Sequence, residues 1–249
     1  MKCIAVILSG GTGNRMNMDI PKQYIEVNDR MIITESIRPF MECALVSGIR
    51  IVADEMWHDK IMDEYRVLSE YYMGGLDVSD CSMDDRDFTG AYKLHGFSKP
   101  GDNRQLSILN ALRDITDAQE DILVIIHDAA RPLASVGLIT RCIEACYGHD
   151  GVMPVLPMKD TVYYSEDGRG ISELLNRDRV FAGQAPEVFR LSQYLKACEA
   201  LLPDKIMEIR GSTEPAVMVG LDVVMIPGEE ENFKITTRED LEHYKELLK

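Results

Sequence analysis

Apolar residues follow two alternating patterns along the first part of the chain, namely short continuous runs and spacings of three or four residues. Ile4–Leu8 and Ile122–Ile126 are continuous runs, which are typical of strands buried on both faces of a parallel sheet. Because runs and helical spacings alternate from residue 4 to about residue 156, we expect a three-layer α/β fold around a mostly parallel central sheet. The other elements expected here are strands at Arg50–Ala53 and Val152–Leu156 and helices at Met31–Cys43, Asp59–Tyr72, Gln105–Ile115 and Val136–Cys146.

The pattern changes after residue 156. Two β-like runs, Lys159–Tyr164 and Arg179–Gly183, flank an Asp167-Gly168 turn signal, so we interpret residues 158–184 as a β-arm that projects from the core. The rest of the chain predicts a helix at Leu191–Leu201, strands at Val223–Ile226 and Phe233–Ile235, and a final helix at Arg238–Leu248.

Residues 73–93 do not follow either pattern. They contain Gly74-Gly75 and five Asp residues, so we expect an irregular acidic insertion. We find no internal repeat and no linker rich in Pro or Ser. We therefore predict that residues 1–249 form one domain that carries the arm and the insertion.

Composition and charge narrow the classes of partner. The formal net charge of −15 makes nucleic acid a poor partner, because its affinity comes mainly from Lys and Arg that neutralise phosphates. A small polyphosphate can still bind where basic residues cluster locally. The six cysteines form no CxxC pair, which favours reduced thiols over a zinc site or a disulfide framework. The apolar run Cys3–Leu8 is too short to cross a membrane, so we expect a cytoplasmic protein with no membrane partner.

A glycine-rich segment directly follows the first run. In an open α/β sheet, loops at the carboxyl ends of strands hold the ligand, and glycines let backbone amides approach phosphate. Ser9–Gly13 has this composition, and Arg15 and Lys22 add positive charge close by. The segment matches neither GxGxxG, since Met16 stands at the third glycine, nor the P-loop pattern. We interpret it as a phosphate-binding loop; the alternative is a glycine turn with solvated charges.

Three more segments are candidates for chemistry. Gly101–Ser107 lies at a junction between a loop and a helix, where contact with a nucleotide and simple helix capping by Asp102 or Asn103 are both open. His127–Pro132 follows the second run. Its Asp128 suits Mg²⁺ or a ribose hydroxyl, or alternatively a strand-end pair with the nearby arginine.

His127 itself is interpreted as a packed or hydrogen-bonded residue rather than a base. Lys234 stands in an expected strand between Phe233 and Ile235 and so faces away from those apolar neighbours. If the side chain of Lys234 has a function, that function would be contact with a phosphate.

In this order along the chain, five segments resemble motifs of the IspD/TarI family of CTP-dependent cytidylyltransferases: GGTGNRM with PKQ, GDNRQLS, HDAARP, NRDRVFAGQAPEVF and NFKIT. The resemblance covers nearly the whole chain. It implies a Rossmann-like nucleotidyltransferase fold of the GT-A-like type. It also implies an enzyme that joins the CMP part of CTP to a small polyol phosphate and releases pyrophosphate, with Mg²⁺ or another divalent cation as cofactor.

The resemblance also implies a role for particular residues. Catalysis would fall to Arg15, Lys22 and Lys234. The nucleotide would be bound by Leu8, Ser9, Gly10, Gly11, Thr12, Gly13, Gly101, Asp102, Arg104, Ser107, Asp128 and Ala129, with Asp128 also at the metal. The second substrate would be bound by Arg131, Thr161 and Arg177. The last two lie on the arm and would act across the interface of a homodimer.

The acceptor is less clearly indicated. Two segments, Gly10–Gly13 and Asn176-Arg177 with Gly183–Pro186, look more like the branch of the family that uses ribitol 5-phosphate. His127–Pro132 looks more like the branch that uses 2-C-methyl-D-erythritol 4-phosphate. We favour a ribitol-5-phosphate-like polyol phosphate, with methylerythritol phosphate as the alternative.

The chain also departs from the family pattern. Arg210-Gly211 stands where the family usually has a Thr-Asp pair that helps to hold the second substrate, and Ser212-Thr213-Glu214 follows. Ala185 stands where Thr is frequent. These differences keep CTP chemistry in place and leave glycerol or arabinitol phosphates open as acceptors.

Two other functions are open from the sequence. One is a sugar-1-phosphate nucleotidylyltransferase that uses another base, because it shares the glycine-loop fold. The other is a regulatory protein that binds nucleotide without turnover.

Overall fold

A sheet that carries most of the strands forms the centre of the molecule. The computed structural model describes residues 1–11, 20–73, 93–115 and 122–249. Within these residues the strands run in the order β5, β4, β1, β6, β11, β7 and β12, with β10 continuing beside the end of β7. Their bounds are β1 Cys3–Leu8, β4 Gly48–Val52, β5 Leu94–Ser98, β6 Leu123–Asp128, β7 Gly151–Pro157, β10 Phe181–Gly183, β11 Glu187–Arg190 and β12 Val223–Pro227.

Most neighbouring strands are parallel, as the sequence predicts. β1 pairs in parallel with β4 and β6, β4 with β5, and β12 with β7. The exceptions are β11, which lies antiparallel between β6 and β7, and β10, which is antiparallel to β7. The sequence analysis did not predict β11, because its four residues follow Pro186 too closely to show a period of their own.

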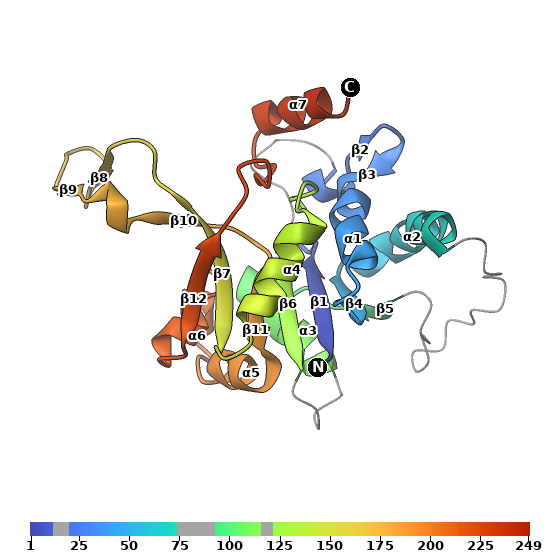
Figure 1. Ribbon diagram of the computed structural model, residues 1–249, viewed down its shortest axis with the longest axis horizontal. Helices are drawn as coiled ribbons and strands as arrows, with labels where there is room; N and C mark the ends of the chain where they lie inside the picture. The colour runs from blue at the N-terminus through green and yellow to red at the C-terminus, as the bar shows by residue number, and fades with distance from the viewer. Residues whose placement is uncertain (12–19, 74–92, 116–121) are drawn as a thin grey trace.

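Helices cover both faces of the sheet and complete three layers (Figure 1). α1, α2 and α4 pack on one face, and α3, α5 and α6 on the other. The side chains of β1 alternate between these layers, with Ala5 and Ile7 in the first core and Ile4 and Val6 in the second. The helices are α1 Ile32–Glu42, α2 His58–Met73, α3 Arg104–Asp114, α4 Val136–Ala145, α5 Leu191–Glu199, α6 Glu214–Met218 and α7 Arg238–Leu247.

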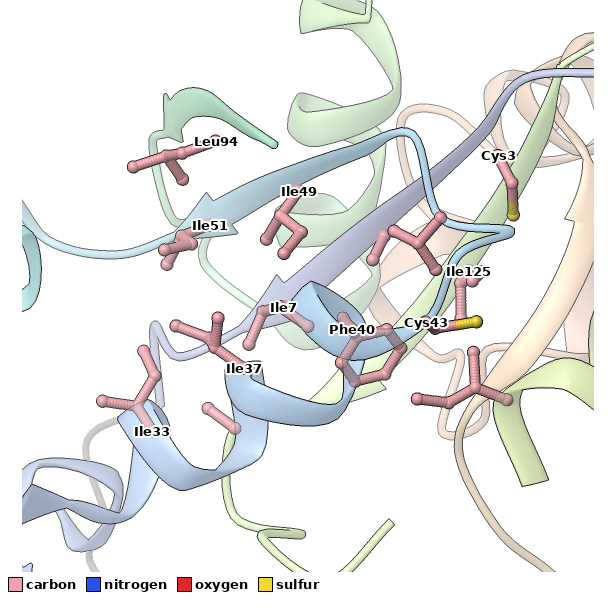
Figure 2. Packing of buried hydrophobic residues seen from close by; sticks show 14 of the residues in the cluster. Cys3, Ile7, Ile33, Ile37, Phe40, Cys43, Ile49, Ile51, Leu94 and Ile125 are labelled. Carbon is pink, nitrogen blue, oxygen red and sulfur yellow. The ribbon is translucent and has the colours of Figure 1, made fainter. Parts of the chain in front are cut away.

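The core beneath α1 illustrates how the apolar pattern is used. Ile37 and Phe40 of α1 face Ile7 of β1 and Ile49 of β4 (Figure 2). None of the four side chains is more than 1% exposed. The ammonium group of Lys93 caps the carboxyl end of α1. It donates to the carbonyl oxygens of Met41, in the last turn, and of Cys43, directly after the helix, which have no partner within the helix.

The β-arm is present but is shorter than predicted. β8 (Val162–Tyr164) pairs with β9 (Glu173–Leu175), and this hairpin projects from the body of the molecule (Figure 1). Gly168 in its turn has φ of 71°, which explains the Asp-Gly signal. The prediction that the run Arg179–Gly183 belongs to the arm was wrong. Its residues Phe181–Gly183 form β10, which pairs with β7 in the main sheet.

The expected strand at Phe233–Ile235 is absent, and this prediction was wrong. The segment forms no strand, and the amide of Ile235 donates to the carbonyl of Ala130, in the turn after β6, at 2.9 Å. Ile235 is buried in a small third core with Leu241 and Tyr244 of α7. Its apolar character therefore reflects packing under the last helix rather than a sheet.

Two expectations from composition are also tested. The cysteines of the described part of the chain are free and buried, at Cys3, Cys43, Cys142, Cys146 and Cys198. Of the helices described, none has the length and apolar character needed to cross a membrane. The acidic insertion predicted at 73–93 lies almost wholly outside the described residues.

We expect Phe40→Ala to lower the free energy of unfolding by about 3–5 kcal/mol, because it removes a fully buried aromatic ring and leaves a cavity beneath α1. Urea denaturation at neutral pH measures the effect. Met56→Ala is the control, since this apolar side chain is 76% exposed and its truncation should change stability little. Equal stability of the two variants would contradict the packing described here.

Candidate active site

A polar cavity lies at the carboxyl ends of β1 and β6, where open α/β sheets bind ligands. Its volume is about 610 Å³, which is the size of a small-molecule site. The lining residues are Leu8, Gly10, Gly11, Lys22, Gln23, Gly101, Asp102, Asn103, Arg104, Ser107, Asp128, Ala130, Lys234 and Thr236. Four segments that are far apart in the sequence therefore meet in one cavity, as the motifs predicted.

The start of the glycine loop is held from behind by the segment that follows it. The side-chain amide of Gln23 donates to the carbonyl oxygens of Ser9 at 2.5 Å and of Gly11 at 2.7 Å. The hydroxyl of Tyr24 also donates to Ser9, and Trp57 stacks on the Tyr24 ring at 4.0 Å between ring centroids. Carbonyl oxygens repel phosphate. Because Gln23 and Tyr24 bind these oxygens, the loop is more suitable for an anion.

The structure places Ser9 inside the fold rather than in the lining of the cavity. Its amide and its hydroxyl both donate to the carbonyl oxygen of Val52, and the residue is 2% exposed. Both donors are thus used within the fold, and the residue does not line the cavity. Gly10 and Gly11 line it instead.

The second wall of the cavity is the amino end of α3. Asn103 is the N-cap, and its side chain accepts a hydrogen bond from the amide of Leu106. The hydroxyl of Ser107 accepts from the amide of Gly101 at 3.0 Å and donates to the carbonyl of Asn103. Capping and lining the cavity are therefore compatible, since Asn103, Gly101 and the neighbouring Asp102 all face it.

Asp128 stands at the centre of the charged groups of the site. Its Oδ1 accepts from two nitrogens of Arg104 at 3.1 and 3.2 Å, and its Oδ2 accepts from Nζ of Lys234 at 2.9 Å. Nε of Arg131 lies 3.6 Å from Oδ2, and the same arginine donates to the backbone carbonyl of Asn232 at 2.6 Å. One carboxylate thereby joins α3, the end of β6 and the loop that carries Lys234.

These neighbours set the ionisation of Asp128. Burial is the largest effect and opposes ionisation, but the positive charges of Arg104, Lys234 and Arg131 together outweigh it and hold the pKa of this carboxyl well below its usual range. Asp128 is therefore ionised at neutral pH although it is only 8% exposed.

His127 has no free face toward the cavity. Burial lowers its pKa to about 4, so the ring is neutral at physiological pH. Its Nε2 lies 3.2 Å from the carbonyl oxygen of Arg131 and must donate to it, and Phe40 packs against the ring. This agrees with the interpretation of His127 as a packed residue rather than a base.

The other predicted site residues fall into three groups. Ala129 is buried, with its amide bonded to Leu8 and its carbonyl to Ser36, and the neighbouring Ala130 lines the cavity in its place. Thr161 and Arg177 are exposed on or beside the arm and are not part of the lining. Thr12, Gly13 and Arg15 lie outside the described residues.

The sequence analysis missed Gln23, Asn103 and Thr236 as lining residues. Gln23 was inside a quoted motif, and Asn103 was considered only as a cap, so neighbouring signals existed for both. No signal pointed to the buried side chains behind Arg104, namely Glu187 and Ser212, which become close to it only in the folded chain.

A divalent cation has few protein ligands available here. Among the described residues, no group of three or more His, Cys, Asp or Glu side chains could hold a metal ion. Both oxygens of Asp128 already accept hydrogen bonds from cations. The residues fit a magnesium ion only if phosphate oxygens of a substrate supply most of its ligands, as is usual for Mg²⁺ at nucleotides.

Comparison with known proteins identifies the family. The model of the family described as IspD, 2-C-methyl-D-erythritol 4-phosphate cytidylyltransferase, matches residues 88–249. The 2-C-methyl-D-erythritol 4-phosphate cytidylyltransferase of Rubrobacter xylanophilus is 32% identical over 242 residues, covering 96% of this chain and 91% of that protein. The chain belongs to the IspD family.

Other relatives extend this assignment. The ribitol-5-phosphate cytidylyltransferase of Streptococcus agalactiae is 29% identical over 249 residues, covering 99% of this chain and 95% of that protein. The chain also spans about half (55%) of a bifunctional enzyme IspD/IspF of Paramagnetospirillum magneticum, with 30% identity. The crystal structure of 4-diphosphocytidyl-2C-methyl-D-erythritol synthase from Anaerococcus prevotii has the same fold, with a TM-score of 0.79, 24% identity and coverage of 99% and 96%.

This assignment confirms three predictions from the sequence, namely the family, the nucleotidyltransferase fold and the class of enzyme. The protein is a cytidylyltransferase, and the family implies CTP and a sugar phosphate as its substrates. The cavity at the ends of β1 and β6 is the candidate site for this reaction.

We expect Gly101→Ala to raise the KM for CTP by about tenfold, comparable to the loss of one charge-assisted hydrogen bond. A Cβ at this position would lie 2.4 Å from Cβ of Leu106 and 2.7 Å from its carbonyl carbon, so the amino end of α3 must shift. Steady-state kinetics of pyrophosphate release measures the change. Gly211→Ala is the matched control, because a Cβ there meets nothing within 4 Å. An unchanged KM in Gly101→Ala would argue against this wall as part of the CTP site.

We expect Asp128→Asn to lower the free energy of unfolding by about 3 kcal/mol at neutral pH, because it leaves three cations without their carboxylate. The pKa of Asp128 is lowered on folding. Its stabilisation is therefore fully present above about pH 5 and is lost as the pH falls below its unfolded pKa of about 3.9.

The difference in stability between wild type and Asp128→Asn should accordingly stay constant from pH 7 to about pH 5 and narrow at lower pH. Urea denaturation at several pH values tests this. Asp63→Asn, which removes an exposed partner of Arg66, should show no comparable loss. A difference that is as large at pH 3 as at pH 7 would contradict the assignment.

Proposed function

We propose that this enzyme transfers the cytidylyl group of CTP to the phosphate of a small polyol phosphate, with 2-C-methyl-D-erythritol 4-phosphate as the first candidate acceptor. The observation that carries the proposal is the gathering of Lys22, Arg104 and Lys234 around one cavity, next to the glycine loop and the carboxylate of Asp128. Such a set suits a polyanionic substrate in an otherwise acidic protein.

The chemistry needs positioning and charge rather than a base. A phosphate oxygen of the acceptor attacks the α-phosphorus of CTP, a new P–O bond forms, and the bond to the β-phosphate breaks to release pyrophosphate. The attacking group is already an anion, so no proton has to be removed. This agrees with the neutral, buried state of His127. Catalysis then depends on cations that stabilise the negative charge that builds up around the α-phosphorus.

Lys234 is the cation that we assign to the α-phosphate. Its ammonium group donates to Oδ2 of Asp128 at 2.9 Å, which keeps the long side chain in the cavity. A triphosphate offers more negative charge than one carboxylate, so Lys234 can turn from Asp128 to the substrate over a short path. Lys22, which lines the same cavity from the glycine-loop side, is assigned to the phosphates together with Arg15.

A divalent cation is part of the proposal. When bound with CTP it would neutralise triphosphate charge, and its protein ligand would be Asp128 if one of the cations leaves that carboxylate. Asp102 lines the cavity and is a second carboxylate within the same space.

The choice of acceptor rests on the relatives and on the family model. The relative of Rubrobacter xylanophilus named for methylerythritol phosphate is 32% identical, and the relative of Streptococcus agalactiae named for ribitol 5-phosphate is 29% identical. The family model also carries the methylerythritol name, which moves our first choice from ribitol 5-phosphate to methylerythritol phosphate. Ribitol 5-phosphate stays the second candidate because that relative covers 99% of this chain.

The arm supports a further part of the proposal, that the enzyme works as a homodimer. Thr161 and Arg177, which we assign to the acceptor phosphate, are exposed and lie outside the lining of the cavity. They would reach an acceptor only at the site of a second subunit. Exposed Tyr163, Tyr164 and Leu174 give the hairpin an apolar surface suited to such an interface.

The deciding experiment measures pyrophosphate release with CTP and Mg²⁺ against methylerythritol 4-phosphate, ribitol 5-phosphate, arabinitol 5-phosphate and glycerol phosphates. We expect turnover with one acceptor and a loss of about 10²–10³ in kcat for Lys234→Ala, the range found for loss of one group that stabilises a transition-state charge. Lys245→Ala, which removes a surface lysine paired with Glu242, is the control and should keep full activity.

Other outcomes point to other functions. Turnover with a different nucleotide triphosphate and a sugar 1-phosphate would replace the proposal by the other nucleotidylyltransferase. Binding of CTP without turnover on any acceptor would favour a regulatory role. Full activity of Lys234→Ala would remove this lysine from the mechanism.

A further inference from the structure

A chain of buried side chains lies behind the arginine of the CTP cavity. The guanidinium of Arg104 is held on two sides, since Nε and Nη2 donate to Asp128 and Nη1 donates to the hydroxyl of Ser212 at 2.5 Å. Ser212 is 1% exposed and belongs to the turn before α6. Asp128 faces the cavity, whereas Ser212 anchors the arginine from the protein interior.

The hydrogen bonds of Ser212 have a fixed direction. Its hydroxyl carries one hydrogen, which it donates to Oε1 of Glu187 at 2.8 Å, and the arginine can only donate to it. The hydroxyl of Thr213 donates to the other oxygen, Oε2 of Glu187, at 2.6 Å. Both carboxylate oxygens of Glu187 are therefore bound by neighbouring hydroxyl groups of one turn.

Glu187 occupies an unusual place for an acidic residue. It lies on β11 in the middle of the sheet and is 8% exposed. Burial raises its pKa, whereas the charge of Arg104 and the two hydroxyl groups oppose that effect. A buried carboxylate costs free energy unless it is compensated. Here the compensation comes from the charge of Arg104 and from the hydroxyl groups of Ser212 and Thr213, so the carboxylate is tied to the arginine of the cavity.

We propose that Glu187, acting through Ser212, is a positioning residue that holds the guanidinium of Arg104 in place for CTP. Arginine side chains have considerable rotamer freedom, and an arginine already fixed in its binding geometry loses less entropy when the ligand arrives. The inference rests on the proposed function, because it assumes that CTP binds in the cavity lined by Arg104.

The same contacts connect the turn before α6 to the cavity. The hydroxyl groups of Ser212 and Thr213 are both committed to Glu187. The turn before α6 is thereby connected through Glu187 and Arg104 to Asp128 and the CTP cavity.

The test is the affinity for CTP, measured by isothermal titration in the presence of Mg²⁺ with no acceptor. We expect Ser212→Ala to raise the dissociation constant of CTP by about tenfold, as for loss of one hydrogen bond to a charged group. Ser212→Thr keeps the hydroxyl and should restore affinity to within about threefold. Steady-state kinetics should show the effect of Ser212→Ala mainly in the KM for CTP and little in kcat, since Lys234 is retained.

Ser69→Ala is the matched control for a purely structural effect. This serine is also 1% exposed, and its hydroxyl donates to the carbonyl of Tyr65 within α2, outside the lining of the cavity. We expect both serine variants to lower the melting temperature, but only Ser212→Ala to weaken CTP binding. If Ser212→Ala does not fold, Glu187→Gln, which preserves the shape of the side chain and removes its charge, should show the same loss of affinity.

Three results would overturn the proposal. The first is wild-type affinity for CTP in both Ser212→Ala and Glu187→Gln. The second is an equal loss of affinity in Ser69→Ala. The third is a fall in kcat with unchanged KM in Ser212→Ala. Wild-type protein that does not bind CTP at all would overturn the proposed function and this inference together, whereas normal wild-type binding with unaffected variants would overturn the inference alone.

Discussion

The carboxylate of Asp128 is the constraint on which the arrangement of the site depends. It ends the central strand β6, and it is buried where an unpaired negative charge would be costly. The fold meets this cost with Arg104 from α3, Arg131 from the following turn and Lys234 from the loop before α7. Three cations that would otherwise repel one another are thus collected at the edge of the sheet, where a triphosphate is suited to bind.

Rigid supports behind the cavity complete this arrangement. Gln23 and Tyr24 bind the carbonyl oxygens of the glycine loop, and Asn103 caps the helix that carries Arg104. Ser212 then holds the far side of the arginine. The cavity is therefore lined by a few charged groups whose positions are set by hydrogen bonds that a ligand would not have to form. Such preorganisation reduces the entropy lost on binding and suits a reaction that depends on charge and geometry.

Much of this could be predicted from the sequence where local pattern and chemistry agree. The apolar runs at Ile4–Leu8 and Ile122–Ile126 indicated the two central strands, and the polar segments that follow them were expected to meet. The prediction failed where local pattern is weak. β11 has only four residues, and the apolar residues around Lys234 pack under α7 instead of forming a strand. In both cases long-range packing, rather than periodicity, decides the structure.

The sequence by itself determined the α/β architecture, the family and most residues of the cavity, because these follow from periodicity and from motifs of neighbouring residues. Tertiary structure alone decided which groups share a charge or a hydrogen bond. Asp128 and Lys234 are separated by 106 positions in the chain, and Arg104 and Ser212 by 108. Nothing in the local sequence marks Glu187, and it gains its partners only when the turn of Ser212 and Thr213 packs against β11. The reason is physical: burial and direct contact determine what a charged side chain does, and both arise only when distant segments pack together.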